Sequence, residues 1–153
     1  MKRKSFRIVL VLFILQLAFI WGNSLLSRED SGGMSFGITA FLQRLFDPDG
    51  RLDPEVFHHY IRKAAHFTEF GLLGALAFLL RRFREDTAEQ VREISFFAPF
   101  CVLLAAVVDE YIQFFADRGS MVPDVVLDFC GGVFGIACTA LIVAVLRDKT
   151  RSK

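Results

Sequence analysis

Four apolar segments, each about as long as a bilayer is thick, constrain what this chain can fold into. They cover residues 8–26, 64–80, 94–115 and 122–146. About 20 apolar residues in a helix cross the hydrocarbon layer, and only helices and closed barrels satisfy their backbone hydrogen bonds there. The composition agrees, since 54% of the 153 residues are hydrophobic and 18 are phenylalanine, which exceeds the need of one soluble core. The sequence therefore predicts an all-α integral membrane protein, a four-helix bundle that forms a single domain over residues 1–153.

Basic residues are distributed unevenly between the two sides that these spans define. Twelve of the 18 lysines and arginines lie before the first span, between the second and third, or after the fourth, and six lie on the other side. The positive-inside rule then places both termini in the cytoplasm. A basic start before an apolar segment also describes a signal peptide. However, Gly22-Asn23-Ser24 matches the cleavage pattern poorly, and cleavage would leave an odd number of spans.

The connection between the first two spans, residues 27–62, is the only long one. Its apolar residues recur at helical spacing, at Ile38, Phe41, Leu42, Leu45 and Phe46. This pattern predicts a short amphipathic helix from Ser35 to Phe46 that lies on the outer membrane surface. It could cover a site as a lid or simply link two spans, and the simple link is the interpretation we favour.

Local signals mark where three helices begin. Asp53-Pro54-Glu55 combines an N-cap residue, a proline at the first helical position and an acid in the first turn. Pro123-Asp124 gives a similar start for the fourth span. Thr87-Ala88-Glu89-Gln90 has capping-box spacing, which predicts that the third helix begins in the cytoplasm and contains Pro99, a residue that tends to kink a helix.

The three cysteines, Cys101, Cys130 and Cys138, all fall inside predicted spans. Cys130 and Cys138 are eight residues apart on one helix, too far to bridge. No Cys/His spacing typical of a structural zinc site occurs. We therefore predict three packing thiols and no disulfide.

Polar residues interrupt the apolar spans at helical spacing. They are His66 and Glu69 in the second span, with Arg62 and Lys63 just before it on the same helix, Asp109, Glu110 and Gln113 in the third, and Asp124 and Asp128 in the fourth. A charged side chain at membrane depth costs from about 3 kcal/mol upward, so it is retained where it faces a partner, a cavity or a site. The alternating direction of the spans brings all three polar stripes to the outer level of the membrane. The sequence therefore predicts one outward-facing polar pocket.

Small residues lie next to this polar level. Gly131-x-x-x-Gly135 in the fourth span, and Gly71 and Gly74 in the second, let neighbouring helices approach closely. We interpret them as helix-packing positions.

Several separated motifs occur along the chain. They are Arg62-Lys63-Ala64-Ala65-His66-Phe67-Thr68-Glu69-Phe70, Asp109-Glu110-x-x-Gln113-Phe114 followed by Arg118, Asp124-x-x-x-Asp128-x-x-Gly131 with Gly135, and the weaker Trp21-x-x-Ser24. Together they resemble the VanZ-like family over all four spans. The resemblance implies a four-helix protein of the bacterial inner membrane. For the member that named the family, it implies a contribution to resistance against teicoplanin-type glycopeptide antibiotics.

The resemblance also implies a set of binding residues: Lys63, His66, Glu69, Asp109, Glu110, Gln113, Arg118, Asp124 and Asp128. The chain departs from the family pattern at three places. Phe70 replaces a common tyrosine, Ala116-Asp117 replaces a Pro-Gly turn, and Asp128 stands where many members have asparagine.

Three functional interpretations stay open at this point. In the first, the site binds an anionic envelope lipid or a glycopeptide-related amphiphile through Arg62, Lys63 and Arg118. In the second, the protein is a membrane-embedded acid/base or metal-dependent enzyme acting on a lipid-linked envelope substrate. Its catalytic candidates are His66, Glu69, Asp109, Glu110 and Asp128. In the third, Arg118 pairs with Asp124, His66 pairs with a carboxylate, and the network only fixes helix register.

The sequence favours binding, because it contains no diagnostic catalytic motif. We predict no cofactor and no resident metal, although the acids could hold a divalent cation. Nucleic acid is not an expected partner, because the basic residues are placed as topological anchors and form no binding stripe. A homo-oligomer stays open.

Overall fold

The computed structural model describes residues 2–25, 40–47, 49, 51–84, 96–116 and 121–151. These ranges contain four long helices: α1 (Lys2–Leu25), α3 (Pro54–Arg84), α4 (Phe97–Phe115) and α5 (Val122–Arg151). A short helix covers residues 40–46, between α1 and α3, and the described ranges contain no strand. All four long helices are long and apolar enough to cross a membrane. The predicted all-α membrane architecture, with a short helix between the first two spans, is therefore confirmed. The predicted first part of that helix, residues 35–39, lies outside the described residues.

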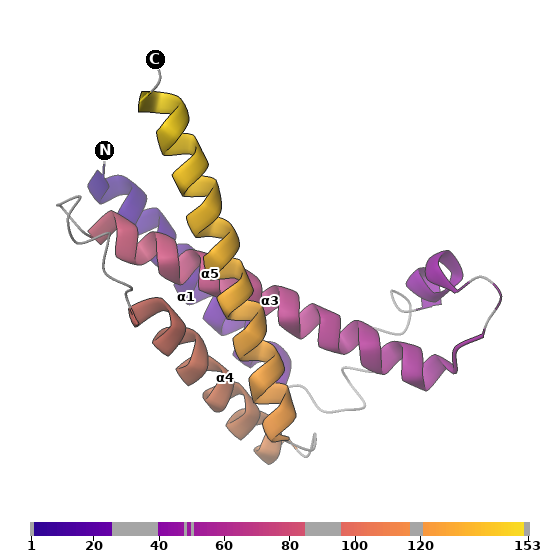
Figure 1. Cartoon of the computed structure of the whole chain (residues 1–153). Helices are drawn as coiled ribbons and strands as arrows, with labels where there is room; N and C mark the ends of the chain where they lie inside the picture. Colours follow the sequence, from indigo (N-terminus) through magenta and orange to yellow (C-terminus); the bar gives the residue numbers. More distant parts are fainter. Residues whose placement is uncertain are drawn as a thin grey trace.

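Figure 1 shows both termini at the same end of the bundle, together with the C-terminal end of α3. The chain therefore crosses the bundle four times and returns to the side on which it began. This arrangement fits the predicted topology, and the assignment of that side to the cytoplasm stays a prediction.

The start of α3 follows the local sequence signal. Oδ1 of Asp53 accepts hydrogen bonds from the backbone N–H of Glu55 at 2.8 Å and of Val56 at 3.4 Å, so Asp53 is the N-cap residue. Pro54 is the first helical residue, where its missing N–H removes no helical bond. In α5, Asp124 lies in the first turn as predicted.

The start of α4 differs from its prediction. The helix begins at Phe97, with Phe96 at the N-cap, so Pro99 lies in the first turn rather than in the helix interior. A first-turn N–H has no helical acceptor, and a proline there needs no kink. The capping-box motif at residues 87–90 lies outside the described residues.

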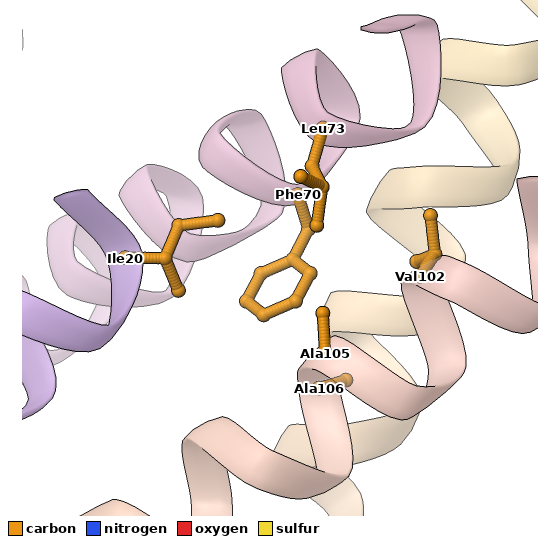
Figure 2. Packing of buried hydrophobic residues seen from close by; sticks show 6 residues of the cluster. All are labelled: Ile20, Phe70, Leu73, Val102, Ala105 and Ala106. Carbon is orange, nitrogen blue, oxygen red and sulfur yellow. The ribbon is translucent and has the colours of Figure 1, made fainter. Parts of the chain in front are cut away.

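An apolar cluster joins α1, α3 and α4. Its buried members are Ile20, Phe70, Leu73, Val102, Ala105 and Ala106. Figure 2 shows the ring of Phe70 between Ile20 and the two alanines of α4. The small alanine side chains leave room for the ring, and Phe70 is fully buried. The phenylalanine that departs from the family pattern is therefore a core residue in this chain.

The contact between α3 and α5 is the most extensive between any two described helices, and glycines make it possible. A Cβ added at Gly135 would overlap the backbone carbonyl of Gly71, and one at Gly131 would overlap the carbonyl of Phe67. A Cβ at Gly74 would likewise overlap the carbonyl of Gly132. The two backbones therefore touch directly, which confirms the predicted small-residue packing.

Candidate functional site

The direct backbone contact sets the register of the polar residues beside it. Gly131 lies against Phe67, which follows His66 in the chain, and Asp128 lies about one helical turn before Gly131. Nδ1 of His66 is accordingly 3.9 Å from Oδ1 of Asp128 on α5, and 4.0 Å from Oδ2 of Asp109 on α4. One potential ligand atom from each of these three residues lies within 4.8 Å of the other two.

Asp109 is a fully satisfied buried carboxylate. It is completely buried, and both of its oxygens accept hydrogen bonds. Ser24 Oγ donates to Oδ1 at 2.7 Å, and Gln113 Nε2 donates to Oδ2 at 2.7 Å. Two bonds of this length to a carboxylate are of the strong, charge-assisted kind. The bond from Ser24 ties α1 to α4, and the two bonds together fix the orientation of the acid.

Ser24 is a site residue that the sequence interpretation did not assign. It is 1% exposed and reaches Asp109 from α1. The only signal was the weak Trp21-x-x-Ser24 motif near the end of the first span. The structure explains both of its residues, because Trp21 Nε1 donates to the carbonyl oxygen of Ala105 at 3.4 Å. The motif thus docks the end of α1 against α4.

Asp128 is bonded differently from Asp109. It is 1% exposed, yet its Oδ2 atom has no hydrogen-bond partner among the described residues. The separation of 3.9 Å between its Oδ1 atom and His66 is also too long for a hydrogen bond. Buried polar atoms are nearly always hydrogen-bonded, and an exception calls for a specific explanation.

A small pocket opens beside Asp128. It is lined by Arg62, Lys63, His66, Glu110, Gln113, Asp124, Leu127 and Asp128. The pocket is small, since the volume open to the centre of a water molecule is about 10 Å³. This suits one water molecule or one ion. A larger ligand can therefore place only one small group inside and must lie mostly at the opening.

Two further contacts join the lining residues. Lys63 Nζ forms an ion pair with Asp124 Oδ1 at 2.9 Å, and Glu110 Oε2 accepts the backbone N–H of Met121 at 3.0 Å. The first contact links α3 to α5, and the second links α4 to the residue before α5. The polar groups of all four long helices, once Ser24 is included, therefore meet at one end of the bundle.

Most of the predicted binding residues come together in this structure. Lys63, His66, Glu110, Gln113, Asp124 and Asp128 line the pocket, and Asp109 lies next to it. Glu69 does not line the pocket; its side chain is half-buried, and the charge of Asp109 acts on it. Arg118 lies outside the described residues. Among the described residues Asp124 forms an ion pair with Lys63, and the predicted pair of Asp124 with Arg118 stays a prediction.

Cys101, Cys130 and Cys138 are free thiols, as predicted. Cys101 and Cys138 are partly buried, whereas Cys130 is exposed and does not pack inside the bundle.

Comparison with known proteins gives one match. A family model described as VanZ/LLP1 matches residues 7–143, a range that includes every described residue of the pocket. Searches of curated proteins and of solved structures gave no match.

Proposed function

Because the chain belongs to the VanZ/LLP1 family and its polar residues meet in one pocket of a membrane bundle, we propose that it binds an anionic envelope amphiphile there. The ligand is an envelope lipid or a glycopeptide-related molecule whose phosphate or carboxylate group lies at the pocket opening. In this proposal the pocket faces outward from a bacterial inner membrane, and ligand binding contributes to tolerance of teicoplanin-type antibiotics.

The observation that carries the proposal is the pairing of cationic side chains with a lipid-facing surface. Arg62 and Lys63 line the pocket, and both side chains are only partly buried. The guanidinium of Arg62 can bind a phosphate or carboxylate through two parallel hydrogen bonds. Exposed apolar side chains follow pocket-lining residues along α4 and α5: Phe114 and Phe115 come directly after Gln113, and Val126 lies between Asp124 and Leu127. An amphiphile needs both surfaces, one for its charged group and one for its acyl chain.

The size of the pocket decides how such a ligand lies. A space of about 10 Å³ excludes an acyl chain or a sugar, so these parts must lie along the helices or above the opening. Only the charged group can interact with Arg62 and with the interior of the pocket.

The test is a thermal melt of the detergent-solubilised full-length protein with short-chain lipids. Dioctanoyl phosphatidylglycerol is the anionic probe, and dioctanoyl phosphatidylcholine is the control lipid. We expect the anionic lipid to raise Tm more than the control lipid, because binding to the native state stabilises it. The variant Arg62→Gln should lose this difference. Arg51→Gln is the matched control, since Arg51 is exposed and pairs with Asp49 outside the pocket.

Equal shifts with both lipids, or an unchanged difference in Arg62→Gln, would contradict the proposal. Teicoplanin tolerance of a susceptible host is measured in parallel for Asp109→Asn, Glu110→Gln and Asp128→Asn. A binding site predicts lost tolerance while the protein stays folded. A structural network predicts a lowered Tm with tolerance unchanged.

A further inference from the structure

From the geometry around Asp128 we infer that His66, Asp109 and Asp128 form a binding site for a divalent first-row transition-metal ion, with Zn²⁺ as the best fit. This inference deepens the proposed function by placing a cation in the same pocket. Only the role of the cation in ligand binding rests on the proposed function, since metal binding itself needs no amphiphile.

The first argument is the spacing of the donor atoms. One imidazole nitrogen and two carboxylate oxygens lie within 4.8 Å of one another. A point equidistant from three atoms at that spacing lies about 2.8 Å or less from each of them, whereas zinc ligands lie about 2.0–2.2 Å from the metal. A movement of about 0.6–0.8 Å by each side chain therefore brings all three donor atoms to the usual zinc–ligand distance. The three residues come from α3, α4 and α5, whose packing holds them in place.

The second argument is the unpaired oxygen of Asp128. Oδ2 is buried and has no hydrogen-bond partner among the described residues, and Asp128 lines the pocket. A cation held by the Asp128 carboxylate would place a positive charge next to that atom. Asp109, in contrast, is already oriented by Ser24 and Gln113. Hydrogen bonds of this kind to a ligating carboxylate fix the geometry of a metal site.

The third argument is charge. Within the described part of the chain, the carboxylates of Glu69, Asp109, Glu110 and Asp124 all act electrostatically on Asp128. The described cationic side chains that line the pocket are Arg62 and Lys63, and Lys63 is already paired with Asp124. In and beside the pocket, four acids (Asp109, Glu110, Asp124 and Asp128) thus face two permanent cations and one histidine. Buried charge without compensation is costly in a membrane, and a divalent ion supplies two positive charges at the centre of the group.

The donor set and the open side of the site favour zinc. Mg²⁺ and Ca²⁺ prefer oxygen ligands alone, whereas an imidazole nitrogen suits Zn²⁺ and other transition metals. Three protein ligands leave one position of a tetrahedral zinc ion open, as in catalytic zinc sites. Because His66 and Asp128 line the small pocket, one water molecule or one oxygen of an anionic ligand would reach the open position from there. The metal would then draw the phosphate or carboxylate of the amphiphile toward Arg62.

The test uses purified full-length protein in detergent, stripped with EDTA and dialysed. Zn²⁺, Mn²⁺ and Mg²⁺ are titrated separately. Bound metal per chain is measured by mass spectrometry of the elements, and Tm is measured by thermal melting. We expect about one Zn²⁺ per chain with a raised Tm, a weaker response to Mn²⁺, and none to Mg²⁺ at the same concentrations.

Variants identify the ligands. Asp128→Asn and His66→Gln should weaken Zn²⁺ binding at least ten-fold, since loss even of a supporting group costs a metal site about that much. Asp148→Asn is the matched control, because it makes the same change on the same helix at an exposed position far from the pocket. If His66→Gln does not fold, Asp128→Asn still decides the matter.

Equal Zn²⁺ binding in the wild type and Asp128→Asn would overturn the inference, and so would the absence of a Zn²⁺-dependent rise in Tm. Failure of this inference can be told apart from failure of the proposed function. The metal titration contains no lipid, and the lipid-induced shift in Tm is measured with and without EDTA.

Discussion

The glycine contact between α3 and α5 and the polar site beside it are held together by opposite means. At the glycine contact two backbones touch, no side chain intervenes, and a single added carbon would overlap a carbonyl group. At the polar site the same helices are separated by charged side chains, and one buried carboxylate oxygen has no hydrogen-bond partner among the described residues. The tightly packed glycine contact therefore positions the polar site, in which one buried oxygen lacks a hydrogen bond. Tight packing holds acids close together that would otherwise repel one another.

Breaking the glycine contact should have the largest effect. In Gly135→Ala the new Cβ overlaps the backbone carbonyl of Gly71, and neither atom can move by changing a rotamer. We expect a loss of about 3 kcal/mol or more, the upper end of the usual cost of overpacking. Separation of α3 from α5 should also remove Zn²⁺ binding, because it moves His66 away from Asp128. Thermal melting and size-exclusion chromatography measure the effect.

The control is Gly22→Ala. A Cβ at Gly22 meets no atom within 4 Å, and alanine is a better helix former than glycine by about 1 kcal/mol. The two identical substitutions should therefore change Tm in opposite directions. A drop of similar size in both would show that the loss in Gly135→Ala does not come from contact with Gly71, since Gly22 has no such contact.

Asp109→Asn should have the second largest effect, because it damages the part of the polar site that is already satisfied. Both oxygens of Asp109 accept hydrogen bonds, and asparagine replaces one of them with an NH2 group, which cannot accept. The charge-assisted bonds become neutral, and a donor comes to face a donor. We expect a loss of about 1 to 3 kcal/mol, measured by thermal melting in EDTA. The smaller change Ser24→Ala removes one donor and should cost less. A wild-type Tm in Asp109→Asn would show that these bonds do not support the fold.

Asp128→Asn sharpens the comparison within the site. The substitution is the same as at Asp109 and the burial is nearly equal, but Oδ2 has no hydrogen bond to lose. Removing a buried charge should even relieve repulsion from neighbouring carboxylates. We expect the free energy of unfolding, measured by thermal melting in EDTA, to change by less than about 1 kcal/mol in either direction. If Asp128→Asn lost as much stability as Asp109→Asn, Asp128 would be a structural acid and no longer a candidate ligand.

The sequence predicts the fold and the level of the site because both depend on local patterns. Hydropathy defines the four spans, Asp53 caps α3 as its spacing indicates, and helical periodicity with alternating direction brings the polar stripes to one end. What the sequence does not show is which acid is satisfied. Ser24 is an ordinary residue in an apolar helix until packing places it 2.7 Å from Asp109, 85 residues further along the chain. The difference between Asp109 and Asp128 therefore arises from contacts between helices, which no local pattern records.

The start of α4 also differs between the sequence prediction and the structure. The capping-box motif predicted a helix beginning well before Pro99, whereas the helix begins at Phe97. A proline in an apolar segment fits either the interior or the first turn, and composition does not distinguish the two positions. The structure does, since the first turn is where the missing N–H removes no bond.

The smallest predicted effect comes from an acid outside the membrane-spanning helices, which contrasts with the buried pair. Asp47 follows the short helix and accepts hydrogen bonds from the backbone N–H groups of Leu52 at 2.8 Å and Arg51 at 3.0 Å. These bonds favour the charged form and lower the pKa of Asp47 below its ordinary value of 3.8. A carboxyl with a lowered folded-state pKa contributes stability above its unfolded pKa, and that contribution is lost as the pH falls through the folded pKa.

Tm of the wild type should therefore decline below about pH 4 by slightly more than Tm of Asp47→Asn, and the gap between the two proteins should close in acid. Because Asp47 is exposed to solvent, the gap at pH 7 should be smaller than that caused by any of the three changes in the bundle. A constant gap from pH 7 to pH 2 would show that Asp47 stabilises the loop through its shape and not through its charge.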